Sequence, residues 1–557
     1  MLSASCLQCP GEGEHKIREF MSYERSQPSY RPDERHCIYG MDADLIFLGL
    51  TTHEINICIL RENVLSTKNC DANDMPFCLT HICLLREYID LEFAELKQSL
   101  PFGYSLEKLV DDWVFMAYLL GNDFIPHLPN MHIHAESLLV LWDTYKVVIP
   151  HLDGYLTNYG QINLKRFHQY ISELSKFDME WFRENEEGNK WIKGKHGERM
   201  ANELETLGQR KKAPEADALV NFFGDDDDDD DIDDAEDEPV PKFKLKSMSL
   251  EHTDQSYVID EFSELGLEDE KPEQEEQDDE DEASSGEDEH IEYRMHRRNY
   301  YQSKLQIDID TSEGENLLNE LVRDYIRMLQ WIMFYYYSAV ADWDFFYHYH
   351  YAPFALDLPL FTKQFLQMEQ KLNWCDFNQQ SKPVLPFTQQ LLIFPPASAY
   401  LVPEIFRDLM TSLDSPLAKY FPLSYETDLN GKQASWESVV LIPFLDKMLL
   451  VNSMQPLLTD LSPSEEERNV HGSHLMYRCP NLQETDCRLL TAKVPASFYR
   501  EHVLRDMTRI EQIYAMPCRR IDPRFPSLNR MGFTFDIRPI GVQVRQFVAF
   551  IVNLESV

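Results

Sequence analysis

Residues 206–290 constrain the fold of this chain more than any other stretch. They include GDDDDDDDIDDAEDEP and EDEKPEQEEQDDEDEASSGEDEH, and residues 221–290 alone hold 31 acidic residues against 4 lysines. Such a segment cannot bury enough apolar surface to offset the conformational entropy lost on folding. We therefore predict a disordered acidic linker that divides the chain into two folded parts. An acidic mimic of nucleic acid is the alternative, although blocks of like charge are usually solvated linkers or tails.

The rest of the chain carries much less charge. The formal net charge of the 557 residues is −44, of which −27 lies in residues 221–290, so the other 487 residues carry −17. Overall acidity normally disfavours a polyanionic partner such as nucleic acid. Because most of the acidity lies in one segment, composition does not exclude such a partner here.

The sequence indicates a soluble protein of a reducing compartment. It contains no run of about 18 apolar residues, so we expect no transmembrane helix and no membrane partner. The start, MLSASCLQCPGEGEH, lacks the basic and apolar regions of a secretion signal. The 11 cysteines are scattered without a disulfide framework. Cys6 and Cys9 form a lone CxxC, for which coincidence is favoured over zinc or redox chemistry.

Residues 1 to about 205 alternate between helix and strand patterns. EHKIREFMSYER places Ile17, Phe20 and Met21 on one helical face. HCIYG and EINICILRE have the β-branched, alternating character of strands. SLEKLVDDWVFMAYLLGND has helical apolar spacing, with Ser105 as a candidate N-cap and Gly121 as a C-terminal stop. The pattern predicts an α/β layer.

Predicted folded structure resumes near residue 292, with sequence patterns that differ from those of residues 1–205. NLLNELVRDYIRMLQWIMFYYY is apolar on a wide face, which predicts a long helix buried on several sides. At the other end, FTFDIRPIGVQVRQF alternates apolar residues around Pro539 and Gly541, which is typical of a hairpin. We expect the last 70 or so residues to begin a small β domain.

Five carboxylates stand at the predicted ends of elements. YGMDADLIFLG contains Asp42 and Asp44, PGEGEH contains Glu12 and Glu14, and GNDFIPHLP contains Asp123. Loops and termini of an α/β layer can converge on one site, where clustered carboxylates repel unless cations neutralise them. Hard oxygen ligands of this kind suit Mg²⁺ or Mn²⁺. Taken singly, each motif is more often a turn or a helix cap, and a DxD also occurs in sugar-nucleotide enzymes.

Several long stretches carry a family resemblance. They are PGEGEHKIREF, RHCIYGMDADLIFLGLTTHE, DDWVFMAYLLGNDFIPHLP, HRRNYYQSKL, HYAPF, DLNGKQASWESVVLIPF and RNVHGSHL. In their order and spacing they resemble the Xrn-type 5′→3′ exoribonucleases, and IPHLPNMHIH is most similar to the cytoplasmic branch. The resemblance covers residues 1 to about 475.

The resemblance implies an α/β nuclease core of the PIN and flap-endonuclease type. Residues 1–205 would form the C-terminal part of the nuclease domain and residues 291–480 a mostly helical second segment of the same core. Residues 206–290 would be the linker, and residues 481–557 the start of a small β-barrel domain.

The resemblance also implies a two-metal site that hydrolyses RNA. By motif, Glu12, Glu14, Asp42, Asp44 and Asp123 match the family's metal ligands, with Mg²⁺ or Mn²⁺ as the cofactor. We expect Asp42 and Asp44 to be buried because a cation needs them there.

RNA contacts are expected at two places. WDFFYHYHYAPF has Trp343 where the family has a first tryptophan, but Phe345 replaces the second; one of them would stack the 5′ base, while Trp343 as a core residue is the alternative. Arg297, Arg298 and Lys304 form a basic stretch interleaved with tyrosines, which is either an RNA contact or a plain helix surface.

The family also implies partners and a location. The substrate would be single-stranded RNA with a 5′-monophosphate, degraded by a monomeric core alongside mRNA decay factors, in the cytoplasm or, alternatively, the nucleus. Only nine residues precede Pro10, whereas the family has a long segment there, so we expect this chain alone to lack a complete site and to be inactive or nearly so. A catalytically inactive RNA-binding scaffold is the rival interpretation.

The linker interpretation predicts that residues 206–290 are dispensable for chemistry, because loop-closure entropy grows only slowly with length. Replacing them with a shorter neutral linker should leave turnover of short RNA within a few-fold and both flanking parts folded. RNA decay assays and thermal melts check this, and a collapse of either would mean that the acidic segment packs on the core.

Overall fold

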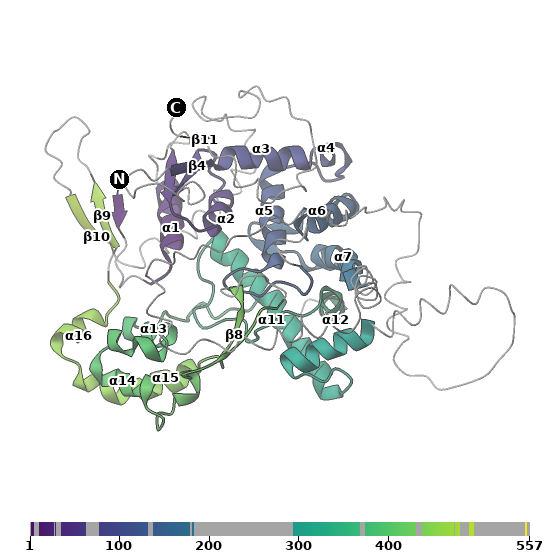
Figure 1. Cartoon of the computed structure of the whole chain (residues 1–557). Coiled ribbons are helices and arrows are strands. Elements are labelled where there is room, and N and C mark those ends of the chain that lie inside the picture. The colour runs from purple at the N-terminus through teal and green to yellow at the C-terminus, as the bar shows by residue number, and fades with distance from the viewer. Residues whose placement is uncertain are drawn as a thin grey trace, which may run out of the picture. The chain divides into compact units, whose positions relative to one another are not determined.

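The computed structural model describes most of the chain outside its acidic middle and its C-terminal end (Figure 1). The described residues are 2–4, 10–26, 28, 30, 35–62, 77–131, 137–178, 181–182, 293–367, 374–430, 437–472, 474–478, 490–494 and 552–553. All of them belong to one unit, built from residues 1–213 and 293–557. The predicted linker, the predicted hairpin around Pro539 and the Cys6–Cys9 pair lie outside the described residues.

A four-stranded sheet forms the centre of the first part. Its order is β11-β4-β3-β2, from β2 (His36–Tyr39), β3 (Ile57–Glu62), β4 (Phe77–His81) and β11 (Val552–Asn553). β2 and β3 are parallel and are connected through α2 (Asp44–Thr51), which makes a βαβ unit, whereas β4 is antiparallel to β3. The strands predicted from HCIYG and EINICILRE, and the α/β character of this part, are confirmed.

Further helices complete the first part. They are α1 (Gly13–Ser26), α3 (Ile82–Glu92), α4 (Leu96–Ser99), α5 (Leu106–Ala117), α6 (Ser137–Val148) and α7 (Leu164–Leu174). Short 3₁₀ helices η2 (Tyr118–Leu120) and η3 (Ile149–His151) extend α5 and α6, and β5 (Thr157–Asn158) pairs with β6 (Gln161–Ile162). Ser105 does stand before α5, but its side chain makes no cap hydrogen bond, and its backbone N–H donates to Tyr155 Oη instead (2.7 Å).

Helix α1 confirms the predicted helix, but its buried face is more polar than the apolar spacing indicates. Met21 is buried, whereas Ile17 and Phe20 are only half-buried. The other buried side chains of α1 are His15, Arg18, Glu19, Ser22 and Arg25. Buried charges need partners, and Arg18 Nη1 donates to the backbone oxygen of Ser338 at 3.1 Å. Arg18 therefore joins α1 to the second part of the chain, whereas Arg25 pairs with Glu54 of the first part at 3.3 Å.

The second part is built around α11 (Ser312–Tyr337), the long helix that the sequence predicts. The Thr311 side chain caps it by accepting from Gly314 N (3.0 Å). Helical residues 293–300 and the π-helix η5 (Tyr301–Leu305) precede α11, and η6 (Ala355–Asp357) and α12 (Leu358–Gln367) follow it. Figure 1 shows α11 running from beside α2 toward α12.

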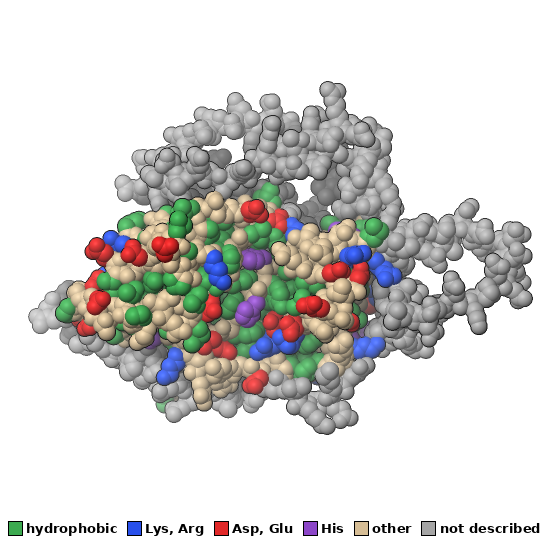
Figure 2. Space-filling view, turned by 90° about the horizontal axis from the view of Figure 1, so that it is seen from below, with side chains coloured by type: hydrophobic (Ala, Val, Ile, Leu, Met, Phe, Trp, Pro, Cys, Tyr) green, Lys and Arg blue, Asp and Glu red, His purple; other side chains and the backbone are tan. Residues whose placement is uncertain are grey.

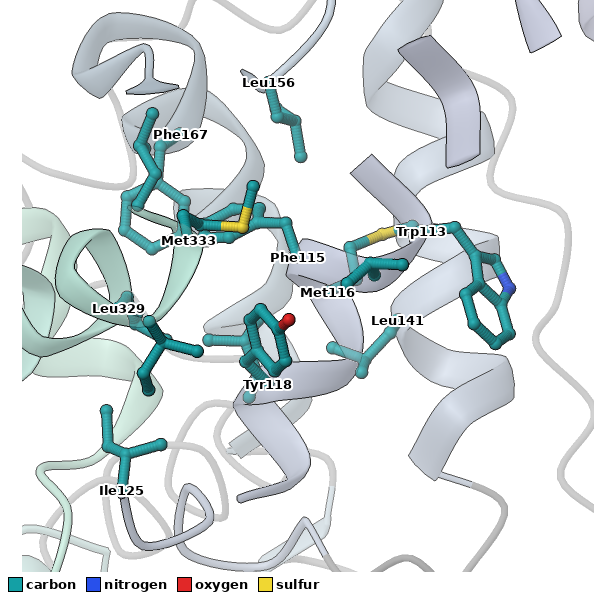
Figure 3. Packing of buried hydrophobic residues seen from close by; sticks show 14 of the residues in the cluster. Trp113, Phe115, Met116, Tyr118, Ile125, Leu141, Leu156, Phe167, Leu329 and Met333 are labelled. Atoms are coloured by element: carbon teal, nitrogen blue, oxygen red, sulfur yellow. The ribbon is translucent and has the colours of Figure 1, made fainter. Parts of the chain in front are cut away.

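One hydrophobic core spans both parts. In Figure 3, Leu329 and Met333 of α11 lie on the side that faces Phe115 and Tyr118, and all four side chains are buried. Gln330, from the same helix, accepts from Ile162 N and donates to the backbone oxygen of Gly160, both at 2.8 Å. The buried wide face that the sequence predicts for this helix is confirmed, and it packs on the α/β layer.

A second, smaller core follows. It lies among α13 (Pro386–Ile393), η7 (Pro396–Leu401), α14 (Glu404–Thr411), η8 (Ala418–Tyr420), α15 (Lys447–Met454) and η10 (Gln455–Asp460). The same stretch of the chain also contains the paired strands β7 (Glu426–Asp428) and β8 (Val439–Leu441), and α16 (Pro463–Arg468). Phe387, Leu391, Phe406 and Leu450 are among its buried residues. Figure 2 shows hydrophobic side chains interspersed with acidic ones on the face seen from below, where Lys and Arg side chains are scattered rather than gathered.

The predicted β-barrel is not confirmed. β1 (Leu2–Ala4), β9 (His474–Arg478) and β10 (Leu490–Val494) form an antiparallel sheet in the order β1-β9-β10, and the described residues include no closed barrel. The boundaries proposed from the sequence at 205, 290 and 480 stay predictions. Among the described helices, none is long and apolar enough to cross a membrane.

Candidate active site

Asp42 and Asp44 stand where β2 gives way to α2. Asp44 is the first residue of α2, and its backbone N–H donates to Asp42 Oδ1 at 3.0 Å. Asp42 is exposed and Asp44 is half-buried. The expectation that both aspartates are buried is therefore wrong for Asp42, because the chain leaves the sheet at Gly40 and Asp42 lies on the loop before α2. Asp42 has a local role in the turn as well as a potential role as a ligand.

Glu12 and Glu14 stand at the start of α1. The backbone N–H of Lys16 donates to Glu12 O at 3.1 Å, and Glu14 lies in the first helical turn. Acidic side chains are favoured at a helix N-terminus because the aligned peptide dipoles leave it partly positive. This local preference places both glutamates at one end of α1 without requiring any ligand.

Asp123 is held by a tight turn after α5 and η2. Asn122 Oδ1 accepts from the backbone N–H groups of Phe124 (2.9 Å) and Ile125 (3.1 Å). Gly121 has a φ of +87°, and a Cβ at this position would lie 2.8 Å from His127 N. Only glycine fits there without strain. The sequence prediction of a helix stop at Gly121 is confirmed, and the stop leaves Asp123 exposed to solvent.

Two tyrosines at the end of α11 reach the carboxylates, and the sequence analysis missed them. Tyr335 donates its hydroxyl hydrogen bond to Glu12 Oε2, and Tyr336 donates to Asp44 Oδ2 at 2.7 Å. The run FYYY was interpreted only as part of an apolar helix face. Its three consecutive tyrosines, each able to bury a ring and donate one hydrogen bond, were the available signal.

The five carboxylates influence one another electrostatically. Burial, and then the charges of Glu14, Asp123 and Asp42, raise the pKa of Glu12, although the Tyr335 hydrogen bond lowers it. Burial, and then Asp42, Asp123 and Glu14, raise the pKa of Asp44 to about 6, against the effect of the Tyr336 hydrogen bond. These influences connect carboxylates from three separate segments, and their assignment to one site stays a prediction.

The donor set fits a hard divalent cation by its chemistry. All five groups are carboxylates, the ligand type that Mg²⁺ and Mn²⁺ prefer. The raised pKa values of Glu12 and Asp44 reflect burial first and then neighbouring negative charge, which a cation would neutralise. As the side chains stand, no three His, Cys, Asp or Glu residues of the described chain form a group that could hold one metal ion. The fit rests on the kind and clustering of the donors rather than on a formed coordination sphere.

The predicted basic stretch is engaged in ion pairs. Arg297 Nε lies 3.1 Å from Asp357 Oδ1 and 3.2 Å from Oδ2. Arg298 pairs with Asp310 at 2.9 Å on the exposed surface, and Lys304 pairs with Asp428. Asp357 is buried, so its pair with Arg297 is part of the folded core. A role of these residues in RNA contact stays a prediction.

The two predicted base-stacking aromatics are both half-buried. The backbone N–H of Trp343 donates to Ser381 Oγ at 2.7 Å. The Arg327 guanidinium lies over the ring of Phe345, 4.7 Å from its centre. The centres of the Phe345 and Phe377 rings are 5.3 Å apart. Phe345 is thus occupied by neighbours within the protein. Stacking of a 5′ base on either residue stays a prediction.

A buried ionic network lies behind the site. His53, directly after α2, adopts φ 55°, and its ring points between two carboxylates of α5. Nδ1 lies 2.6 Å from Glu107 Oε2 and Nε2 lies 2.9 Å from Asp111 Oδ1, while Arg86 also pairs with Glu107. Burial alone lowers the pKa of His53, but Asp111 and Glu107 outweigh it and raise that pKa to about 9. The network fixes the end of α2 that is opposite Asp44.

Comparisons with known proteins identify the family of the chain. A family profile described as "Xrn1 helical domain" matches residues 103–514, and one described as "XRN 5'-3' exonuclease N-terminus" matches residues 2–63. The chain therefore belongs to the Xrn family of 5′→3′ exonucleases.

The curated relatives include proteins named "5'-3' exoribonuclease 1" and "5'-3' exoribonuclease 2". The chain is 34% identical to "5'-3' exoribonuclease 1" of Homo sapiens, over 97% of this chain and 30% of that protein. It is 32% identical to the protein of the same name in Saccharomyces cerevisiae, over 84% of this chain and 33% of that protein. It is 30% identical to "5'-3' exoribonuclease 2" of Candida albicans, over 85% of this chain and 54% of that protein. The chain thus spans about a third of the length of the first two.

The His53 network makes stability depend on pH. The folded pKa of about 9 lies above the ordinary 6.5, so this stabilisation is complete below pH 6.5 and is lost as pH rises through 9, by up to about 3 kcal/mol. Glu107 acts oppositely: burial raises its pKa, but Arg86 and His53 lower it to about 2, so its contribution is lost as pH falls from 4.5. Urea unfolding between pH 3 and 10 measures both limbs.

His53→Gln should flatten the alkaline limb of that profile. The exposed His151 provides the matched control, and His151→Gln should leave the profile as it is in the parent. An alkaline decline that persists unchanged in His53→Gln would mean that another group causes it.

Proposed function

We propose that this chain forms the catalytic region of a 5′→3′ exoribonuclease that hydrolyses single-stranded RNA from a 5′-monophosphate end with the help of Mg²⁺ or Mn²⁺. The observation that supports this most is the carboxylate cluster: Glu12, Glu14, Asp42, Asp44 and Asp123 come from three segments and act on one another's charge. Membership of the Xrn family gives the reaction class its support.

Clustered negative charges lower the stability of the folded state, and binding of a cation would explain why the protein keeps them together. Like charges at one place destabilise the folded state unless they are protonated or neutralised. Helix caps and turns need only one carboxylate each, and they do not require three segments to meet. A divalent cation bound among these oxygens acts as a Lewis acid toward a phosphodiester. In this proposal Glu12, Glu14, Asp42, Asp44 and Asp123 hold the cation.

Partners and location follow from the same proposal. The relatives are named exoribonucleases, so RNA is the proposed substrate. We propose mRNA decay factors as partners, a monomeric core, and action in the cytoplasm, with the nucleus as the alternative. The scattered basic side chains of the face in Figure 2 favour RNA contacts elsewhere than on that face.

The substrate proposal predicts selectivity for the 5′ end. The natively expressed protein, purified through a tag at its own gene, should degrade 5′-monophosphorylated RNA in Mg²⁺ and spare triphosphorylated and capped RNA of the same sequence. Gel assays with the three RNAs measure this. Equal decay of all three would refute the end selectivity, and RNA binding without any decay would favour the inactive scaffold.

The site proposal predicts that single carboxylates are essential. In the natively expressed protein, Asp42→Asn, Asp44→Asn and Asp123→Asn should each cut single-turnover decay by at least about 100-fold. Removing a residue that only supports a metal ligand typically costs about 10- to 100-fold in activity, and removing the ligand itself should cost more. RNA binding should hold or improve, because each change removes a charge that repels phosphate. Asparagine at 42 keeps the acceptor that Asp44 N–H uses.

Stability separates this proposal from the helix-cap interpretation. In metal-free buffer Asp44→Asn should hold or raise the melting temperature, because its carboxylate is half-buried among like charges. The exposed Asp153, which pairs with Arg166 at 2.7 Å, is the control, and Asp153→Asn should keep parental turnover. If Asp44→Asn melts early and still degrades RNA at the parental rate, the metal-site assignment is wrong.

A further inference from the structure

Two carboxylates of the cluster share an arrangement that the others lack among the described residues. Each accepts one hydrogen bond from a buried tyrosine hydroxyl, Glu12 through Oε2 from Tyr335 and Asp44 through Oδ2 from Tyr336. The two tyrosine side chains are 5% and 3% exposed, so their hydroxyls have little access to water. Glu12 Oε1 and Asp44 Oδ1 accept no hydrogen bond from the described residues.

We propose that Tyr335 and Tyr336 are positioning residues for the cation: each fixes one carboxylate oxygen so that the other faces the cluster as a ligand. This inference rests on the proposed function, because it assigns the tyrosines a role toward the same cation. A carboxylate on a flexible side chain must lose rotamer freedom to bind an ion, and a partner that restricts it beforehand raises metal affinity.

The tyrosines are themselves held rigidly. The ring of Tyr335 stacks with that of His15, at 4.1 Å and 12°, and with that of Trp331, at 5.2 Å and 11°. Trp331 Nε1 in turn donates to the backbone oxygen of Asp342 at 2.9 Å. A hydroxyl on a buried ring that stacks with two others can hold the carboxylate of Glu12 in one place.

Tyr336 is fixed from its backbone and its ring. Its backbone oxygen accepts from Thr51 Oγ1 at 3.3 Å, and its ring lies 5.4 Å from that of Tyr118. Thr51 is the last residue of α2, and Asp44 is the first. Tyr336 therefore touches both ends of α2, which ties the orientation of Asp44 to the docking of α11.

The test replaces each hydroxyl and measures metal binding directly. In the natively expressed protein, Tyr335→Phe and Tyr336→Phe should each weaken Mn²⁺ affinity by about 10- to 100-fold, measured by calorimetry, because only the carboxylate's partner is lost. Tyr337→Phe is the matched control: it is the next residue of α11, 1% exposed, and its hydroxyl has no hydrogen-bond partner among the described residues. Its Mn²⁺ affinity should stay within two-fold of the parent.

Turnover provides a second readout that a purely structural role would not move. In the two phenylalanine variants the Mn²⁺ concentration for half-maximal RNA decay should rise by the same factor as the dissociation constant, while decay at saturating Mn²⁺ returns to within a few-fold of the parent. Asp44→Asn should not be restored by any Mn²⁺ concentration, because it removes the ligand itself.

The outcomes separate this inference from the proposed function. If Asp44→Asn weakens Mn²⁺ binding but neither tyrosine variant does, the positioning role is wrong and the metal site stands. If Asp44→Asn leaves Mn²⁺ binding unchanged, the metal site and the positioning role both fail. The two tyrosines are judged separately, because each serves a different carboxylate.

Discussion

The docking of α11 on the α/β layer is the interaction on which the rest of the structure depends. Its buried face fills the core beside Phe115 and Tyr118, and Gln330 satisfies backbone groups of the β5–β6 hairpin. At the C-terminal end of α11, the buried Arg18 guanidinium donates a hydrogen bond to the backbone oxygen of Ser338, the residue that follows the helix. The same end carries Tyr335 and Tyr336 to the carboxylates. Both parts of the chain therefore contribute residues to the core and to the surroundings of the carboxylates.

The motifs that carry the family resemblance meet one another in the fold. Asp428 of DLNGK accepts from Tyr351 of HYAPF at 2.6 Å and pairs with Lys304 of the basic stretch. Asn430 of the same motif lies 3.4 Å from His127 of IPHLP, on the loop that carries Asp123. Residues that look like candidates for RNA contact in the sequence thus serve first to join segments. A charged residue in a recognisable motif has to satisfy buried partners before it can serve a ligand, since unpaired buried charges are costly.

The two clusters of ionisable residues in the first part differ in the signs of their charges. Around His53 the charges alternate in sign, so each group stabilises the charged form of its neighbours and the network supports the fold at neutral pH. Around Asp44 the charges that raise its pKa are all negative, and among the described residues tyrosine hydroxyls donate to Glu12 and Asp44. α2 connects the two clusters, with Asp44 at its start and His53 just after its end. A stabilising network at one end of a short helix can thus support a repulsive cluster at the other.

The sequence by itself determined the parts and their chemistry. Apolar periodicity located α5, α11 and the β2–β3 pair, because burial imposes the period of the element on the chain. Motif positions located the five carboxylates at the ends of elements. Only the tertiary structure decided that Asp42 is exposed, that the buried face of α1 is polar, and that Tyr335 and Tyr336 donate hydrogen bonds to Glu12 and Asp44. The contacts of Arg18, Glu12 and Asp44 with the second part join residues some 290 to 320 positions apart. Local patterns carry no information about such partners, since a tyrosine on an apolar helix face looks the same whether its hydroxyl meets a carboxylate or, like that of Tyr337, meets no described partner.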